Sequence, residues 1–245
     1  MNLLKKLLFP PKCAACHALL DWYGTRQSDA LCPACLDEWN RAKAVTCAIC
    51  GKPVTACACL PDEMQKAKCK SFRKLTYYHG GRRDRVQNRV IYHIKETRDA
   101  RTVKFLALEL TDAVKDSIDP NGETVLTYTP RGRAAKLEYG TDQAQRLAKE
   151  LSRVYTIPCV RMLRRSRRRD PEQKDLSLSA RKENAKTAFS LVQNRDVKGK
   201  HVILVDDIVT TGNTLAACAR LLYRAGAASV RCIAVSSNDA NREIT

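Results

Sequence analysis

The sequence predicts an α/β protein in which a parallel sheet is flanked by helices and preceded by a small cysteine-rich module. From residue 75 onwards, apolar runs of strand length alternate with segments whose apolar residues recur at helical spacing. This alternation is typical of parallel strands joined by crossover helices. Four closely spaced cysteine pairs lie between Cys13 and Cys59. We therefore expect a metal-binding module over residues 1–62, a basic linker over 63–74 and the α/β domain over 75–245.

The composition indicates which partners to expect. A chain of 245 residues, 44% of them hydrophobic, is long and apolar enough for one α/β domain with its own core. Lys and Arg number 44 against 26 Asp and Glu, a net charge of +18. This charge predicts an anionic partner: a nucleic acid, a nucleotide or a phosphosugar. The apolar runs in residues 1–11 are too short for a signal peptide or a membrane span, so we expect a cytoplasmic protein.

The cysteine pairs have the spacing of structural zinc sites. A Cys-x-x-Cys turn brings two thiolates to one tetrahedral Zn²⁺, and two such turns complete a closed four-cysteine site. The simple pairing gives one site of Cys13, Cys16, Cys32 and Cys35 and a second of Cys47, Cys50, Cys57 and Cys59. Crossed pairing and unliganded thiols are the alternatives that the spacing leaves open.

The elements of the α/β domain follow from apolar spacing and from turn residues. Val86, Val90, Ile91 and Ile94, for example, share one face of a helix, whereas β-branched and aromatic runs bounded by polar turns predict strands. The expected strands are 75–78, 123–128, 159–163, 189–192, 201–207 and 229–235. The expected helices are 82–96, 103–114, 139–153, 177–188 and 215–222.

The strand at 201–207 carries the strongest functional signal. It is aliphatic enough to be buried on both faces, and it ends in two adjacent carboxylates, Asp206 and Asp207. The loop that follows contains Thr210, Thr211, Gly212, Asn213 and Thr214, and a helix begins after it. Loop amides at a helix start bind phosphate, and paired carboxylates accept hydrogen bonds from vicinal hydroxyls. This order predicts a phosphosugar pocket; the alternative is an acidic pair that only caps the helix.

Two cationic loops accompany this pocket. Arg131 and Arg133 follow the strand at 123–128, which suits a second polyphosphate contact, although an ordinary basic loop is the alternative. The densest positive run is residues 161–169, with six arginines. We interpret this run as either a solvated mobile loop or an anion-binding lid, and both descriptions can hold together.

The stretch 201–215 resembles the phosphoribosyl pyrophosphate (PRPP) signature of type I phosphoribosyltransferases. A zinc-ribbon-like module ahead of such a signature is the arrangement of the ComF family, which is associated with DNA uptake. Further residues match that family's patterns: Leu7 to Cys13, Ile91 to Lys95, Gly140, Gln143, Gln173, Leu176, Arg181, Asn184 and Phe189. Residues 139–143 depart from it, reading Tyr-Gly-Thr-Asp-Gln where the family has Arg-Gly-Phe-Asn-Gln.

The resemblance implies a type I phosphoribosyltransferase fold behind a double zinc ribbon, with structural zinc and with Mg²⁺ bound to PRPP. It implies that Asp206 and Asp207 are the catalytic pair that holds the ribose hydroxyls, and that residues 210–214 hold the 5′-phosphate. Arg131 and Arg133 would meet the pyrophosphate. The phosphoribose would pass to an acceptor that the sequence does not name.

Two other functions compete with a transferase. One is a non-catalytic adaptor in transformation that binds single-stranded DNA or a competence helicase or other DNA-processing protein. The other is a regulator that senses PRPP without consuming it. The net charge favours the adaptor, but aromatic residues make up only 6% of the chain, so no stacking platform for bases is evident.

Overall fold

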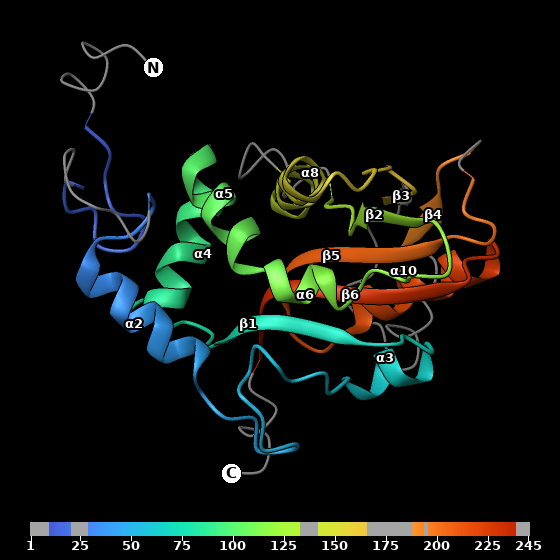
Figure 1. The fold of residues 1–245 in the computed structure, drawn as a ribbon, viewed down its shortest axis with the longest axis horizontal. Helices are drawn as coiled ribbons and strands as arrows, with labels where there is room; N and C mark the ends of the chain where they lie inside the picture. The colour runs from blue at the N-terminus through green and yellow to red at the C-terminus, as the bar shows by residue number, and fades with distance from the viewer. Residues whose placement is uncertain (1–9, 21–28, 133–141, 166–187, 194–195, 239–245) are drawn as a thin grey trace, which may run out of the picture.

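A four-stranded parallel sheet forms the centre of the computed structural model (Figure 1). The structure describes residues 10–20, 29–132, 142–165, 188–193 and 196–238. In spatial order the strands are β1 (Phe72–Tyr78), β6 (Ser229–Asn238), β5 (His201–Val209) and β2 (Thr124–Tyr128). All three pairings are parallel, so the carboxyl ends of the strands meet at one edge of the sheet.

Two helical layers cover the two faces of the sheet. On one face, Ile203 and Val205 of β5 join the core made with α4 (Val86–Glu96), α5 (Ala100–Glu109), α6 (Thr111–Lys115) and α8 (Gln143–Tyr155). On the other face, Val202 and Leu204 join the core made with α3 (Asp62–Lys66) and α10 (Asn213–Arg224). Strand β5 is therefore buried on both faces, as its unbroken aliphatic run predicts.

Several boundaries differ from the sequence expectation. The helix expected at 103–114 is split into α5 and α6. The strand expected at 159–163 is wrong in position, because Cys159 makes only an isolated bridge to Leu126 and the strand β3 spans Leu163–Arg165. Strand β3 pairs antiparallel with β4 (Phe189–Leu191). The helix expected at 177–188 lies almost wholly outside the described residues.

The residues expected to be a linker form regular structure. All of helix α3 after its first residue, Asp62, and the first three residues of β1 fall within 63–74, because apolar Met64 and Phe72 pack into the core between the lysines. The division of the chain at 62 and 74 remains a prediction. None of the helices in the described parts of the chain combines the length and the apolar character that crossing a membrane requires.

The N-terminal module docks against the helical layer through α2 (Pro33–Lys43). Trp39 is fully buried, lies 5.6 Å from the Phe105 ring between centroids, and donates from Nε1 to Glu109 at 2.7 Å. Arg101 extends from α5 to the carbonyl oxygens of Lys12 and Asp29, at 3.5 Å each. The module is therefore packed against α4 and α5, and its helix α2 lies beside α4 in Figure 1.

Asp99 is expected to be a strong stabilising residue at this junction. Its carboxylate caps α5 by accepting from the Arg101 amide at 3.0 Å, and it accepts from the Thr102 hydroxyl at 2.8 Å. Burial opposes ionisation, but hydrogen bonds from His93 and Thr102 and the charge of Arg101 hold the pKa of Asp99 well below its usual range. Asp99→Ala should lower the free energy of unfolding by about 2 kcal/mol at neutral pH.

The lowered pKa sets the pH dependence of this effect. Because the folded state binds the Asp99 proton more weakly than the unfolded state, the stabilisation is complete above about pH 4 and is lost as the pH falls. Urea unfolding of both proteins from pH 7 to pH 3 measures it, and the difference between them should shrink on acidification. The exposed Asp84, paired with Arg82, gives the control Asp84→Ala, which should change stability little. Equal losses in the two variants would contradict the assignment.

Candidate functional site

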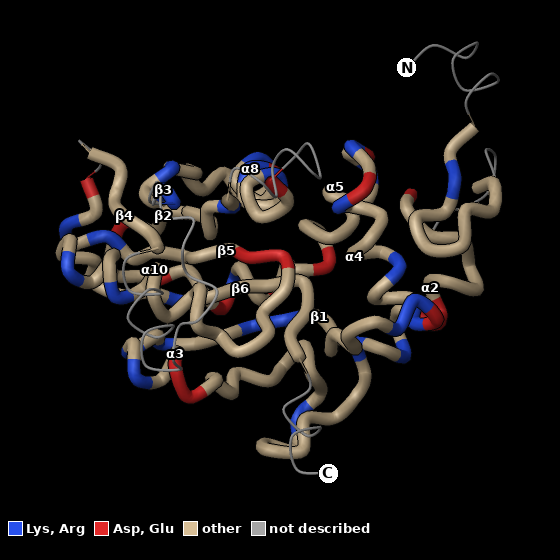
Figure 2. The backbone as a smooth tube through the Cα atoms, turned by 180° about the vertical axis from the view of Figure 1, so that it is seen from behind, with Lys and Arg blue, Asp and Glu red and all other residues tan. Residues whose placement is uncertain are grey.

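The two carboxylates predicted at the end of β5 are both buried. Asp206 and Asp207 are 8% and 5% exposed, and they form a short acidic segment near the end of β5, which continues to Val209 rather than ending at the pair (Figure 2). The Asp207 amide donates to Asp206 Oδ1 at 2.9 Å. Burial, followed by the neighbouring charge of Asp207, raises the pKa of Asp206 well above its usual range, against an opposing hydrogen bond from Thr129. The site therefore disfavours two full negative charges in the absence of a cation or a hydroxyl-bearing ligand.

Arg131 supplies a cation to this acidic pair. Its Nη2 donates to Asp207 Oδ2 at 2.6 Å, and its backbone amide lies 3.4 Å from Asp142 Oδ2. Asp142 also caps α8 by accepting from the Gln145 amide, a role for which Asp and the family's Asn are equally suited. The contact of Arg131 with Asp207 thus joins the loop after β2 to β5. Arg133, the other predicted cation of this loop, lies outside the described residues. The predicted contact of Arg131 with pyrophosphate would require its guanidinium to be shared with Asp207.

The Thr/Gly loop lies where the sequence predicts it, between β5 and α10. Gly212 is the N-cap of α10 and has a φ of +76°, a left-handed conformation that glycine adopts most readily. Thr210, Thr211, Asn213 and Thr214 are exposed around it. Their amides and hydroxyls therefore surround the N-terminus of a 12-residue helix, an arrangement that can bind a phosphate group.

The Thr/Gly loop packs against residues that the sequence analysis assigned to a linker. A Cβ atom on Gly212 would lie 3.0 Å from Met64 Cγ and 3.1 Å from Pro61 Cβ. Arg220 of α10 pairs with Glu63 of α3 at 3.2 Å. The chain just after the second cysteine cluster therefore packs directly against the candidate phosphate loop. An apolar Met64 among lysines was the sequence signal for this packing.

Gly212→Ala is expected to combine backbone strain with overpacking. Gly199 has nearly the same φ, +74°, but open space around its Cβ position, so Gly199→Ala isolates the backbone effect. We expect Gly199→Ala to cost about 1 kcal/mol of unfolding free energy and Gly212→Ala about 1–3 kcal/mol more. Only Gly212→Ala should also weaken PRPP binding. Denaturant titration and calorimetry measure the two effects, and equal behaviour of the two variants would show that the α3 contact does not constrain the loop.

The eight cysteines of the N-terminal module gather as two groups of four. Within each group, the Sγ atoms lie within 4.8 Å of one another. The first group is Cys13, Cys16, Cys32 and Cys35, and the second is Cys47, Cys50, Cys57 and Cys59. This grouping is the simple pairing. Tetrahedral Zn²⁺ with Zn–S bonds of about 2.3 Å needs sulfur atoms about 3.8 Å apart, and Cys16 and Cys32 are 3.6 Å apart. Both groups therefore fit a closed structural zinc site.

Hydrogen bonding lowers the pKa of two of these thiols and so favours their thiolate form. Burial opposes ionisation of Cys13, but backbone hydrogen bonds from Cys16, Cys32 and Ala15 lower its pKa to about 7. At Cys47, burial is likewise outweighed, first by a hydrogen bond from the Tyr77 side chain, and the pKa falls to about 6. Thiolates are the form that binds zinc. The residue that sequence reasoning missed is Lys74, which is 4% exposed and places its Nζ 3.5 Å from Cys57 Sγ.

Comparison with protein families finds a domain in each half of the chain. Residues 4–71 match the double zinc ribbon domain, and residues 140–243 match the phosphoribosyl transferase domain. Among solved structures, the phosphoribosylpyrophosphate synthetase of Mycobacterium smegmatis aligns over 56% of this chain and 33% of its own, with 21% identity and a TM-score of 0.33.

Curated relatives include proteins of competence and DNA utilisation. DNA utilization protein YhgH of Escherichia coli K12 is 52% identical over 56 residues, 23% of this chain and 24% of that protein, so the match spans about a quarter of its length. Competence protein F of Haemophilus influenzae is 36% identical over 38% of this chain and 41% of its own. Competence protein ComFC of Bacillus subtilis is 24% identical over 83% of this chain and 82% of its own.

The fold and the two domains define the class: this is a chain of type I phosphoribosyltransferase fold that carries a double zinc ribbon at its N-terminal end. The resemblance to the ComF family is confirmed by that pair of domains and by the competence proteins among its relatives.

Proposed function

We propose that this protein binds PRPP together with Mg²⁺ and transfers its phosphoribosyl group to an acceptor. The observation that carries this proposal is the buried acidic pair at the end of β5, followed by the Thr/Gly loop at the N-terminus of α10. In parallel α/β sheets, ligands bind at the carboxyl ends of the strands, which is where this segment lies.

Each group has a part in the proposed reaction. Asp206 and Asp207 accept hydrogen bonds from the ribose hydroxyls and stabilise positive charge on the sugar as the bond at C1 breaks. The amides of residues 210–214 hold the 5′-phosphate. Arg131 offsets charge on the departing pyrophosphate, and Mg²⁺, bound with the substrate, would supply further positive charge there. Zinc in the two cysteine clusters has a structural role.

The test of this proposal is calorimetric titration of the intact, zinc-loaded protein with PRPP and Mg²⁺, with ribose 5-phosphate as the comparison. We expect saturable binding with PRPP the tighter ligand, because only PRPP can engage the cationic loop after β2. Absence of PRPP binding would overturn the proposal. Pyrophosphate release with added acceptors then separates a transferase from a regulator that binds PRPP without consuming it.

A nucleic-acid adaptor is the second candidate, and the net charge of +18 together with the names of the relatives favours it. Lys and Arg occur on most elements rather than gathering on one (Figure 2). Binding of single-stranded DNA through phosphates should weaken steeply as salt rises. Either function, including a partnership with a competence helicase or DNA-processing protein, suits the cytoplasm, where cysteine thiolates stay reduced for zinc.

A further inference from the structure

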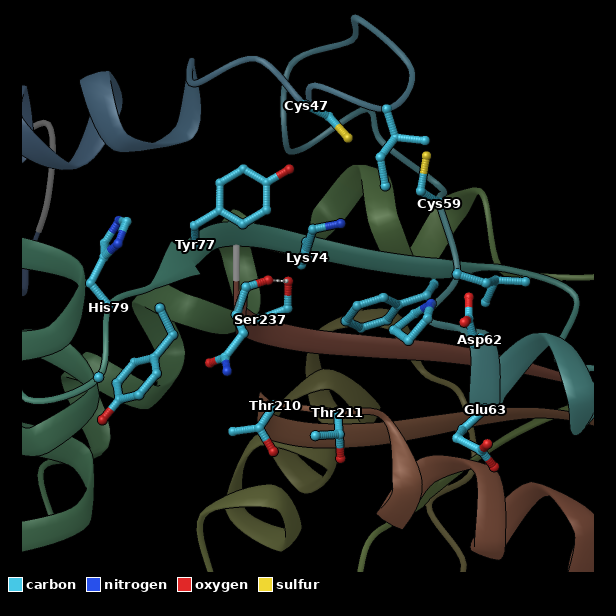
Figure 3. A pocket seen from close by; sticks show the side chains of 17 residues that line it. Cys47, Cys59, Asp62, Glu63, Lys74, Tyr77, His79, Thr210, Thr211 and Ser237 are labelled. Atoms are coloured by element: carbon cyan, nitrogen blue, oxygen red, sulfur yellow. Dashed lines mark hydrogen bonds between the residues drawn. The ribbon is translucent and has the colours of Figure 1, made fainter. Parts of the chain in front are cut away.

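Lys74 of β1 is a buried lysine that faces the second cysteine cluster. Its side chain and that of Tyr77 project from β1 towards Cys47 and Cys59 (Figure 3). Lys74 Nζ lies 3.5 Å from Cys57 Sγ, and the centroids of the Phe72 and Tyr77 rings are 5.1 and 5.6 Å from it. A buried ammonium is costly unless a negative charge lies beside it. The surroundings of Lys74 must therefore supply that charge.

The second cluster, rather than a carboxylate, carries the matching charge. Asp62 and Glu63 line the same cavity as Lys74, but Glu63 pairs with Lys66 and Arg220. In the described parts of the chain, no carboxylate forms an ion pair with Lys74. Four thiolates that hold a divalent zinc ion carry a net charge of about −2, whereas four neutral thiols carry none. The buried ammonium therefore fits the cluster in its metal-loaded form.

We propose that Lys74 is a positioning residue for the second zinc centre: it donates a hydrogen bond to the Cys57 thiolate, offsets part of the negative charge and so raises the affinity of the cluster for zinc. All four ligands of this ion lie in the ribbon, whereas Lys74 belongs to the central sheet. The sheet thus takes part in holding the ion. This role is independent of PRPP binding and goes beyond the proposed function.

Strand β1 holds the second ribbon through neighbouring contacts, which fix Lys74 relative to the cluster. Arg73 Nη1 donates to the Thr55 carbonyl oxygen at 3.5 Å. The Tyr77 side chain hydrogen-bonds to Cys47. On its other side, β1 is joined to β6 by a parallel ladder that includes residue 74. The ammonium therefore reaches Cys57 from a strand that is itself held in place.

The first cluster has a different set of donors. Cys13 Sγ accepts from the backbone amides of Ala15 and Cys32 at 3.5 and 3.4 Å. Arg101 reaches this ribbon but donates to backbone carbonyl oxygens rather than to sulfur. Among the described residues, no lysine or arginine side chain donates to a sulfur atom of the first cluster. Loss of the Lys74 charge should therefore affect the second cluster alone.

Three variants separate charge from packing. Lys74→Met removes the ammonium but keeps a long unbranched side chain, and a cavity of about 610 Å³ on one side of residue 74 leaves room for it. An apolar residue usually packs at least as well as a charged one in a buried position, so a role in packing alone predicts no loss. Lys74→Arg keeps the charge. Lys52→Met is the matched control, because Lys52 is an exposed lysine of the same ribbon.

Competition with a chromophoric chelator measures zinc affinity in the intact, zinc-loaded protein. Mass spectrometry of alkylated cysteines then identifies the cluster that has released its ion. We expect Lys74→Met to weaken zinc binding at the second cluster by about tenfold to a hundredfold and to leave the first unchanged. Lys74→Arg should stay closer to the wild type than Lys74→Met does, and Lys52→Met should match the wild type.

Substitution with Co²⁺ gives a readout that is independent of affinity. With both clusters filled, the sulfur-to-metal charge-transfer absorption of the second cluster should move to lower energy in Lys74→Met. A thiolate that loses a cationic hydrogen-bond donor holds its electrons less tightly. The spectrum of Lys52→Met should not change.

Four results would overturn the assignment. The first is wild-type zinc affinity in Lys74→Met with an unshifted cobalt spectrum. The second is equal weakening at both clusters, which would indicate a loss of folding. The third is an equal loss in Lys52→Met, which would indicate an effect of net charge. The fourth is an equal loss in Lys74→Arg, which would show that the charge of residue 74 is not what holds the ion.

Discussion

Asp207→Asn and Asp206→Asn are each expected to weaken PRPP binding by at least about a hundredfold. An amide keeps the size of the side chain but replaces one acceptor oxygen with a donor and removes the charge. The ribose hydroxyls of bound PRPP then lose a charge-assisted hydrogen bond. Calorimetric titration with PRPP and Mg²⁺ measures the affinity of each variant.

The two variants should differ in stability, and this difference separates loss of binding from loss of folding. Burial and the adjacent charge make ionised Asp206 costly, so Asp206→Asn should keep or raise the free energy of unfolding. Asp207→Asn should lower it, because the buried ion pair between Arg131 Nη2 and Asp207 Oδ2 at 2.6 Å is lost. Asp196→Asn, at a side chain 74% exposed, controls for the change in net charge. PRPP affinity like that of the wild type in both site variants would show that the acidic pair does not hold the sugar.

The sequence was sufficient to predict the central strand and its loop for a physical reason. A strand buried on both faces needs an unbroken aliphatic run, so two adjacent carboxylates at its end stand out. The turn to α10 needs a left-handed residue, which explains Gly212. The grouping of the cysteines also follows from local spacing, since each Cys-x-x-Cys turn fixes two sulfur positions.

Features that depend on contacts distant in the sequence were not predictable in this way. The pairing of Arg131 with Asp207 joins residues 76 positions apart. The packing of Met64 against Gly212 and the contact of Lys74 with Cys57 both bring the presumed linker into a site. A lysine-rich composition indicates solvent exposure on average, but it does not reveal which apolar residue, or which lysine, is buried. The position of β3 was not predicted correctly, because a three-residue strand has too little periodicity to detect.

The largest expected effect outside the acidic pair comes from removing zinc from the second cysteine cluster. Cys50→Ser and Cys16→Ser form a matched pair, because each replaces the exposed second cysteine of a Cys-x-x-Cys turn, one in each cluster. Each variant should lose about one zinc ion per chain. Each should also unfold at a lower temperature than the wild type, since metal binding contributes to folding.

PRPP binding should distinguish the two clusters. The chain passes from Cys59 through Leu60 to Pro61 and Met64, which pack against Gly212 of the phosphate loop. The first cluster has no comparable contact with that loop among the described residues, and its neighbours belong to the core on the opposite face of the sheet. Loss of zinc from the second cluster should therefore loosen the phosphate loop and weaken PRPP binding by about tenfold, whereas Cys16→Ser should bind PRPP as the wild type does.

Zinc content by mass spectrometry, thermal unfolding and PRPP titration of the same samples measure these effects. Equal PRPP affinities in Cys50→Ser and Cys16→Ser, with one zinc ion lost from each, would show that the second ribbon does not support the loop. Met64→Ala tests the same connection without touching a metal ligand. It should weaken PRPP binding while retaining both zinc ions, because the apolar contact beneath Gly212 is lost and the two clusters are left intact.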